Sequence, residues 1–194
     1  MRLTKLSLVA LFSCTVMAGG LGAAEQGKSL YNYDNGTTQG WWVFKGGGSE
    51  LEISAAKPGA NNSDGALKAV YKNGKSGSYL GIGIQPKWAM GGKADFAAYA
   101  KGALLISLKG DAAMSLKIEL RMENKETYSF TINDIGMEWK DYVVKFEEFK
   151  GKEKVLNLTA TPEIAQIVLM PKSKDGASHT LLIDEIKVVE AAGN

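Results

Sequence analysis

The chain has 194 residues, of which 45% are hydrophobic, 23 are lysine or arginine and 21 are aspartate or glutamate. This length fits one domain better than two, and a formal charge of +2 excludes the strongly basic surface of a nucleic-acid-binding protein. The single cysteine and the single histidine exclude a disulfide framework and a zinc site built from several of these residues.

The first 24 residues have the pattern of a secretory signal peptide. Arg2 and Lys5 give a positive start, residues 6–16 form an apolar run that includes the cysteine, and small residues at 22–24 offer a cleavage site. We expect cleavage after Ala24, which leaves one domain over residues 25–194 of a secreted or periplasmic protein. No later apolar run approaches the roughly 18 residues that a transmembrane helix needs, so no transmembrane segment is expected.

The remaining chain alternates between apolar and polar residues with a period of two, which is typical of strands. The strictest alternation covers residues 114–122, with Met, Leu and Ile on one face and Ser, Lys, Glu and Arg on the other. Together with residues 127–132 it predicts a hairpin. The expected strands are 31–33, 41–44, 51–54, 67–71, 79–84, 104–108, 114–122, 127–132, 142–146, 165–170 and 180–189. Single helical turns are expected at 96–100, 146–149 and 162–164. Many short strands with glycine-rich turns between them favour a sandwich or barrel.

The order of the motifs resembles a known family. Residues 30–41, 65–71, 95–111, 139–149, 164–169 and 182–186 are similar, in this order, to the successive core segments of jelly-roll carbohydrate-binding modules. The whole resembles the galactose-binding-like jelly roll, and within it family 11-like carbohydrate-binding modules, with much of the pattern shared by complex I intermediate-associated protein 30-like domains. The resemblance implies an all-β sandwich, a jelly roll of two antiparallel sheets, and a polysaccharide or oligosaccharide as partner.

The same resemblance implies a structural calcium ion. Asp34 and Asp184 match the acidic residues that open and close the family pattern, and calcium takes about six to eight oxygen ligands. Asn35 stands where the family has a second acidic residue, so the site carries less charge. The alternative is that both carboxylates accept hydrogen bonds from backbone groups in turns.

Candidate sugar-binding residues are those that break the core pattern. A pyranose ring packs one face on an indole or phenol ring, while nearby polar groups bind its hydroxyls. Trp42 follows another tryptophan directly, so the two side chains point to opposite faces of a strand. Tyr79 lies among glycines and Trp88 in a loop-like segment, whereas Glu119 and Arg121 project from the polar face of 114–122.

No pattern indicates catalysis. None of the 21 carboxylates is marked as part of a glycosidase pair, and a serine-based triad would have to use His179 without the usual Gly-x-Ser-x-Gly turn. We therefore predict that the chain is not an enzyme but a secreted carbohydrate-binding protein, which recognises a β-glucan-like polysaccharide on one sheet face. The alternative is a structural or protein-interaction module of the bacterial cell envelope, with another envelope protein as partner.

Overall fold

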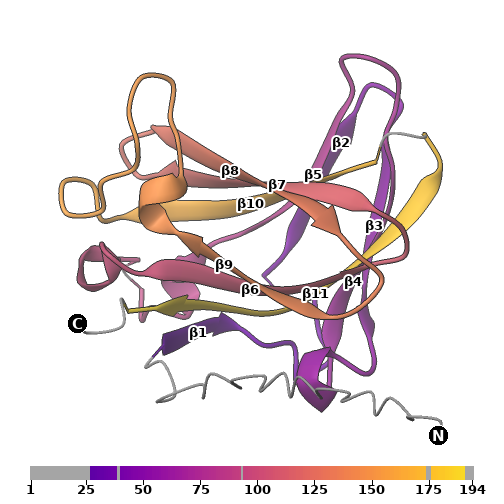
Figure 1. The fold of residues 1–194 in the computed structure, drawn as a ribbon, viewed down its shortest axis with the longest axis horizontal. Coiled ribbons are helices and arrows are strands. Elements are labelled where there is room, and N and C mark those ends of the chain that lie inside the picture. Colours follow the sequence, from indigo (N-terminus) through magenta and orange to yellow (C-terminus); the bar gives the residue numbers. More distant parts are fainter. Residues whose placement is uncertain (1–26, 39, 93, 174–175, 191–194) are drawn as a thin grey trace, which may run out of the picture.

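The computed structural model describes residues 27–38, 40–92, 94–173 and 176–190. The predicted signal peptide lies outside them. Within these ranges the chain forms strands and short 3-10 turns without an α-helix, and the strands make two stacked sheets (Figure 1). None of the helical turns in these ranges is long and apolar enough to cross a membrane.

The first sheet is antiparallel and has the order β3-β4-β11-β6-β9, with β1 also paired to β11. Its longest strand, β11, pairs with β4 through its first half and with β6 along nearly its whole length. The strands are β1 (Gly27–Tyr31), β3 (Glu50–Ala56), β4 (Ala66–Lys72), β6 (Ala103–Gly110), β9 (Lys140–Lys145) and β11 (Ser178–Val189).

The second sheet is also antiparallel and has the order β2-β5-β10-β7-β8. Its central strand, β10, pairs with β5 on one side and with β7 on the other. The strands are β2 (Trp42–Gly46), β5 (Tyr79–Ile84), β7 (Met114–Met122), β8 (Thr127–Ile135) and β10 (Ile164–Lys172).

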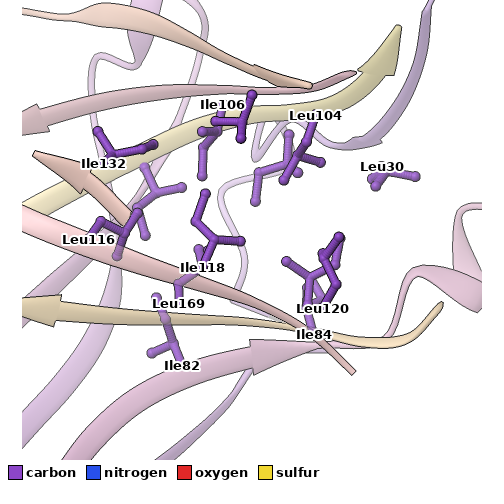
Figure 2. Packing of buried hydrophobic residues seen from close by; sticks show 14 of the residues in the cluster. Leu30, Ile82, Ile84, Leu104, Ile106, Leu116, Ile118, Leu120, Ile132 and Leu169 are labelled. Carbon is purple, nitrogen blue, oxygen red and sulfur yellow. The ribbon is translucent and has the colours of Figure 1, made fainter. Parts of the chain in front are cut away.

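The core fills the space between the two sheets. Leu104 and Ile106 enter it from the first sheet and Ile82, Ile118 and Leu169 from the second, all at most 1% exposed (Figure 2). Each of these strands alternates, so one face is buried here and the other points away from the core. On the outward face of the first sheet, Ala103, Leu105 and Val189 form a second, smaller buried cluster.

This architecture confirms the expected all-β jelly roll of two antiparallel sheets. The strands 79–84 and 114–122 have the expected bounds, and the predicted hairpin forms, with the backbone N–H of Met122 donating to the carbonyl of Glu126 at 2.9 Å.

Two local expectations are wrong. The first strand covers Gly27–Tyr31 rather than 31–33, because Tyr33 has a left-handed φ of 57° and turns the chain away. Residues 162–164 do not form a helical turn, because Ile164 already pairs with Met122 as the first residue of β10. Two 3-10 turns, η1 (Ala60–Asn62) and η2 (Pro86–Trp88), were not expected, whereas η3 (Ala97–Tyr99) and η4 (Phe146–Glu148) lie at expected places.

Candidate functional site

Strand β5 has two unlike faces. Leu80, Ile82 and Ile84 point into the core and are at most 3% exposed. The opposite face carries Tyr79 and then two glycines, Gly81 and Gly83. The outer face of the second sheet therefore has a floor without side chains along most of this strand.

Aromatic rings fill that floor. Each ring lies over the glycine opposite it on the paired strand, so closely that a methyl group on the glycine would collide with ring atoms. The pairs are Trp42 with Gly83, Phe44 with Gly81 and Tyr79 with Gly46. We call these three rings the ring platform.

The platform is ordered as a layer. The rings of Phe44 and Tyr79 are stacked, with centroids 6.5 Å apart and an interplanar angle of 28°. Val168, which faces Gly83 from β10 on the same side, is 0% exposed although it does not belong to the main core. Tyr79 is nevertheless 58% exposed, so the platform offers an aromatic surface to solvent.

A row of charged side chains on β7 lies beside the platform. Glu119 is shared by two cations, with Oε1 2.9 Å from Lys117 Nζ and Oε2 3.2 Å from Arg121 Nη2. The guanidinium carbon of Arg121 lies 5.8 Å from the centroid of the Phe44 ring, within the range of a cation–π contact. Partial burial raises the pKa of the Glu119 carboxyl, but Lys117 and Arg121 outweigh burial and hold the pKa below its usual value.

A cleft of about 730 Å³ lies at the Tyr79 end of this face. One wall is the loop of residues 73–78 between β4 and β5, and the floor includes Met170 and Thr131. The wall is tied down, because Asn73 Oδ1 accepts hydrogen bonds from the backbone N–H and the hydroxyl of Ser173, at 2.9 and 3.2 Å. The cleft is thus a preformed extension of the platform.

Four of the five predicted sugar-binding residues lie on this one face: Trp42, Tyr79, Glu119 and Arg121. Trp88 does not belong to the ring platform, since it ends η2, which follows β5 at the end opposite Tyr79. It is 70% exposed, and Lys87 Nζ lies 5.2 Å from its ring centroid. That any of the five contacts a sugar stays a prediction.

Sequence reasoning missed Phe44 and Lys117. A signal for Phe44 was present, because it lies two residues after Trp42 and so shares its face. Lys117 lies two residues before Glu119 in the same alternating strand. What the sequence alone did not supply was the pairing of β2 with β5, which makes the two glycines a floor.

The two aspartates of the predicted calcium site line one cavity of about 310 Å³. Asp184, which is 2% exposed, accepts hydrogen bonds from the backbone N–H of Ala60 at 2.8 Å and from the hydroxyl of Ser63. Asp34 is exposed and accepts from the Asn32 side chain at 2.8 Å. Among the described residues no group of three or more histidine, cysteine or acidic side chains could hold a metal ion. The hydrogen bonds of Asp184 suit the alternative, and the calcium site stays a prediction.

Comparisons with known proteins agree with this fold. The model of carbohydrate-binding domain 30 matches residues 29–190, whereas no curated protein matches the chain. The family 11 carbohydrate-binding module of the cellulosomal cellulase Lic26A-Cel5E of Clostridium thermocellum has a TM-score of 0.67 and 16% identity, over 89% of this chain and 99% of that chain.

Two further solved structures are similar. A family 11 module from the same organism, in complex with a β-1,3-1,4-mixed-linked tetrasaccharide, has a TM-score of 0.66 and 16% identity over 89% of this chain and 100% of that one. The family 30 module of the cellulosomal cellulase Cel9D-Cel44B of Clostridium thermocellum has a TM-score of 0.62 and 11% identity, over 86% and 99%. These likenesses show the shared fold. The family model matches most of the chain, and the chain therefore belongs to the carbohydrate-binding domain 30 family.

Proposed function

We propose that this carbohydrate-binding module is secreted and non-catalytic, and that it holds a β-glucan-like polysaccharide on the outer face of the second sheet. The observation that carries the proposal is the ring platform, in which three aromatic rings lie over glycines, with Tyr79 exposed and Trp42 and Phe44 partly exposed.

The platform and the charged row supply the two kinds of contact that a sugar needs. A flat ring packs against the C–H face of a pyranose, and the side chains of Glu119 and Arg121 lie within reach of hydroxyls at its edge. The similar family 11 module is named as a complex with a β-1,3-1,4-mixed-linked tetrasaccharide, which supports a β-glucan backbone as the first ligand to test.

The surroundings of His179 support a non-catalytic role. Its side chain is 9% exposed, and its Nδ1 lies 3.1 Å from Asp111 Oδ1. The other oxygen of Asp111 accepts a hydrogen bond from the backbone N–H of Thr180 at 2.7 Å. These contacts hold the start of β11, and His179 itself is buried rather than open to a substrate.

An exposed apolar patch without polar groups would favour the alternative function, a protein-interaction module of the cell envelope. On the outer face of the second sheet the rings instead lie beside the charged row of Lys117, Glu119 and Arg121, and Arg121 contacts the Phe44 ring. This mixture favours sugar over an apolar protein surface.

Affinity electrophoresis of residues 25–194 through gels with a soluble mixed-linkage β-glucan tests the proposal. We expect retardation that is lost in Trp42→Ala and in Phe44→Ala, while Trp88→Ala tests separately the predicted residue outside the platform. Circular dichroism of each variant separates lost binding from lost folding. Retardation that persists in both platform variants would overturn the assignment to this face.

Structural calcium is proposed separately. If Asp34 and Asp184 hold calcium, a chelator should lower the melting temperature of the wild-type protein and leave Asp34→Asn unchanged. Equal melting temperatures of the wild type with and without the chelator would favour the alternative, in which Asp184 only accepts hydrogen bonds.

A further inference from the structure

The cleft beside the ring platform is positively charged. Lys75 comes from the wall loop, Lys117 from β7 and Lys172 from the end of β10, and all three line the cleft. No aspartate or glutamate lines it among the residues that the structure describes. Three segments that are far apart in the sequence therefore bring their lysine ammonium groups to the same cleft.

The carboxylate that pairs with Lys117 does not neutralise this charge. Glu119 serves both Lys117 and Arg121, so one negative charge faces two positive ones. Its side chain is only 14% exposed, whereas those of Lys117 and Arg121 are 46% and 41% exposed. No ion pair within the described ranges engages Lys75 or Lys172. At Lys117 the groups that a ligand would meet first are thus cations, and the exposed Asp134 lies in a neighbouring pocket that Lys172 also lines.

The charged cleft and the platform are one continuous surface. Tyr79 lines the cleft and also stacks on Phe44 at the centre of the platform. A sugar chain that packs on Phe44 and continues past Tyr79 would place its next residues among the three lysines. The Asn73–Ser173 hydrogen bonds fix the wall in advance, so little ordering of this loop is needed on binding.

We propose that the polysaccharide bound on this face is acidic, a β-linked pyranose chain whose uronate carboxylates or sulfate esters lie against Lys75, Lys117 and Lys172. This inference rests on the proposed function and names the class of its ligand. A neutral chain would cover the lysines without offering them an anion, whereas an anionic group forms charge-assisted hydrogen bonds with them.

The test compares ligands that share a backbone and differ in charge. Isothermal titration calorimetry of residues 25–194 uses cello-oligosaccharides, β-1,4-glucuronan oligosaccharides of equal length, and sulfated cello-oligosaccharides; polyglutamate serves as a polyanion without sugar. We expect an acidic ligand to bind at least about tenfold more tightly than the neutral one at low salt, with an advantage that shrinks as salt screens the charges. The tighter of the two acidic ligands identifies carboxylate or sulfate as the anion.

Lysine variants locate the effect. Lys75→Gln and Lys172→Gln should each weaken binding of the acidic ligand about threefold, the size of one solvent-exposed ion pair, and leave the neutral ligand unchanged. Lys101→Gln is the matched control, because Lys101 is exposed and precedes β6 of the first sheet, away from the cleft.

The outcomes separate this inference from the proposed function. Equal or tighter binding of the neutral ligand would overturn the acidic class while leaving a carbohydrate-binding face. Polyglutamate binding as tightly as glucuronan, without loss in Phe44→Ala, would also overturn it, because charge alone would then explain the binding. Binding of none of the sugars would overturn both.

Discussion

On β5, the side chains that point into the core are leucine and isoleucine, whereas two of the three outward positions are glycine. The inner face is filled by its own strand, and the outer face is left empty for rings that come from β2. The two faces of this sheet therefore have different roles, core packing on one and support of the aromatic rings on the other. Bulk on one side maintains the fold, and its absence on the other creates a flat surface on which rings can lie.

The largest expected effect comes from the inner face. Ile82→Ala removes a side chain that is 0% exposed and should lower the free energy of unfolding by about 2–5 kcal/mol in urea denaturation. Sugar affinity measured on the folded protein should stay unchanged, because Ile82 points away from the platform. A loss of affinity equal to that of a platform variant would show that the two faces are not independent.

A substitution at a glycine beneath the rings should affect both the stability of the protein and its binding to sugar. Gly83→Ala places a methyl group against the Trp42 ring and should cost about 1–3 kcal/mol of stability, since the ring must move. Binding to the sugar gel should fall at the same time. Gly136→Ala is the control, because a methyl group there meets no neighbouring atom within 4 Å. If Gly83→Ala had the stability and the sugar binding of the wild type, the proposed role of Gly83 beneath the Trp42 ring would be wrong.

Removal of an exposed ring should affect binding alone. Tyr79→Ala should weaken sugar binding about tenfold in calorimetry, while the free energy of unfolding changes by less than about 0.5 kcal/mol, because the side chain is 58% exposed. Tyr79→Phe retains the ring and should retain the stacking contribution. If Tyr79→Phe binds as poorly as Tyr79→Ala, the hydroxyl group rather than the ring makes the contact.

The smallest effect concerns the charged row and depends on pH. The pKa of Glu119 is lowered in the folded protein, so its ion pairs stabilise the fold above the ordinary pKa of 4.5 and lose their effect as the pH falls through the lowered value. Glu119→Gln should therefore be less stable than the wild type at neutral pH by under about 1 kcal/mol, since both cations are largely solvated. In urea titrations the difference in free energy of unfolding between the wild type and Glu119→Gln should vanish in stronger acid. A difference that grows as the pH falls would contradict a lowered pKa of Glu119 in the folded protein.

Much of the fold follows from local pattern. In β7 each apolar residue is followed by a polar one, so both bounds and both faces could be predicted, as could the hairpin to β8. The bounds of β1 could not, because its end depends on the left-handed turn at Tyr33, a residue type that rarely adopts that conformation.

The site was predictable only in part, and for a physical reason. Tyr79 breaks a local pattern, whereas Glu119 and Arg121 follow one as the polar face of β7, so each could be found without knowledge of its neighbours. Phe44 and Lys172 acquire their significance from partners on other strands. Phe44 needs Gly81 opposite it, and Lys172 needs the loop of residues 73–78 across the cleft. Strand register brings such partners together, and it cannot be predicted from any short segment of the sequence.

The ring–glycine pairs also have an evolutionary consequence. Because Phe44 and Tyr79 lie on a neighbouring strand's glycine and are not among the residues packed against the core, a substitution such as Phe44→Tyr alters the recognition surface without altering the residues that hold the two sheets together. Ligand preference can then drift while the glycines and the inner isoleucines stay fixed. The outer face of the second sheet is accordingly the place to redesign when a module of this scaffold is wanted for a different sugar.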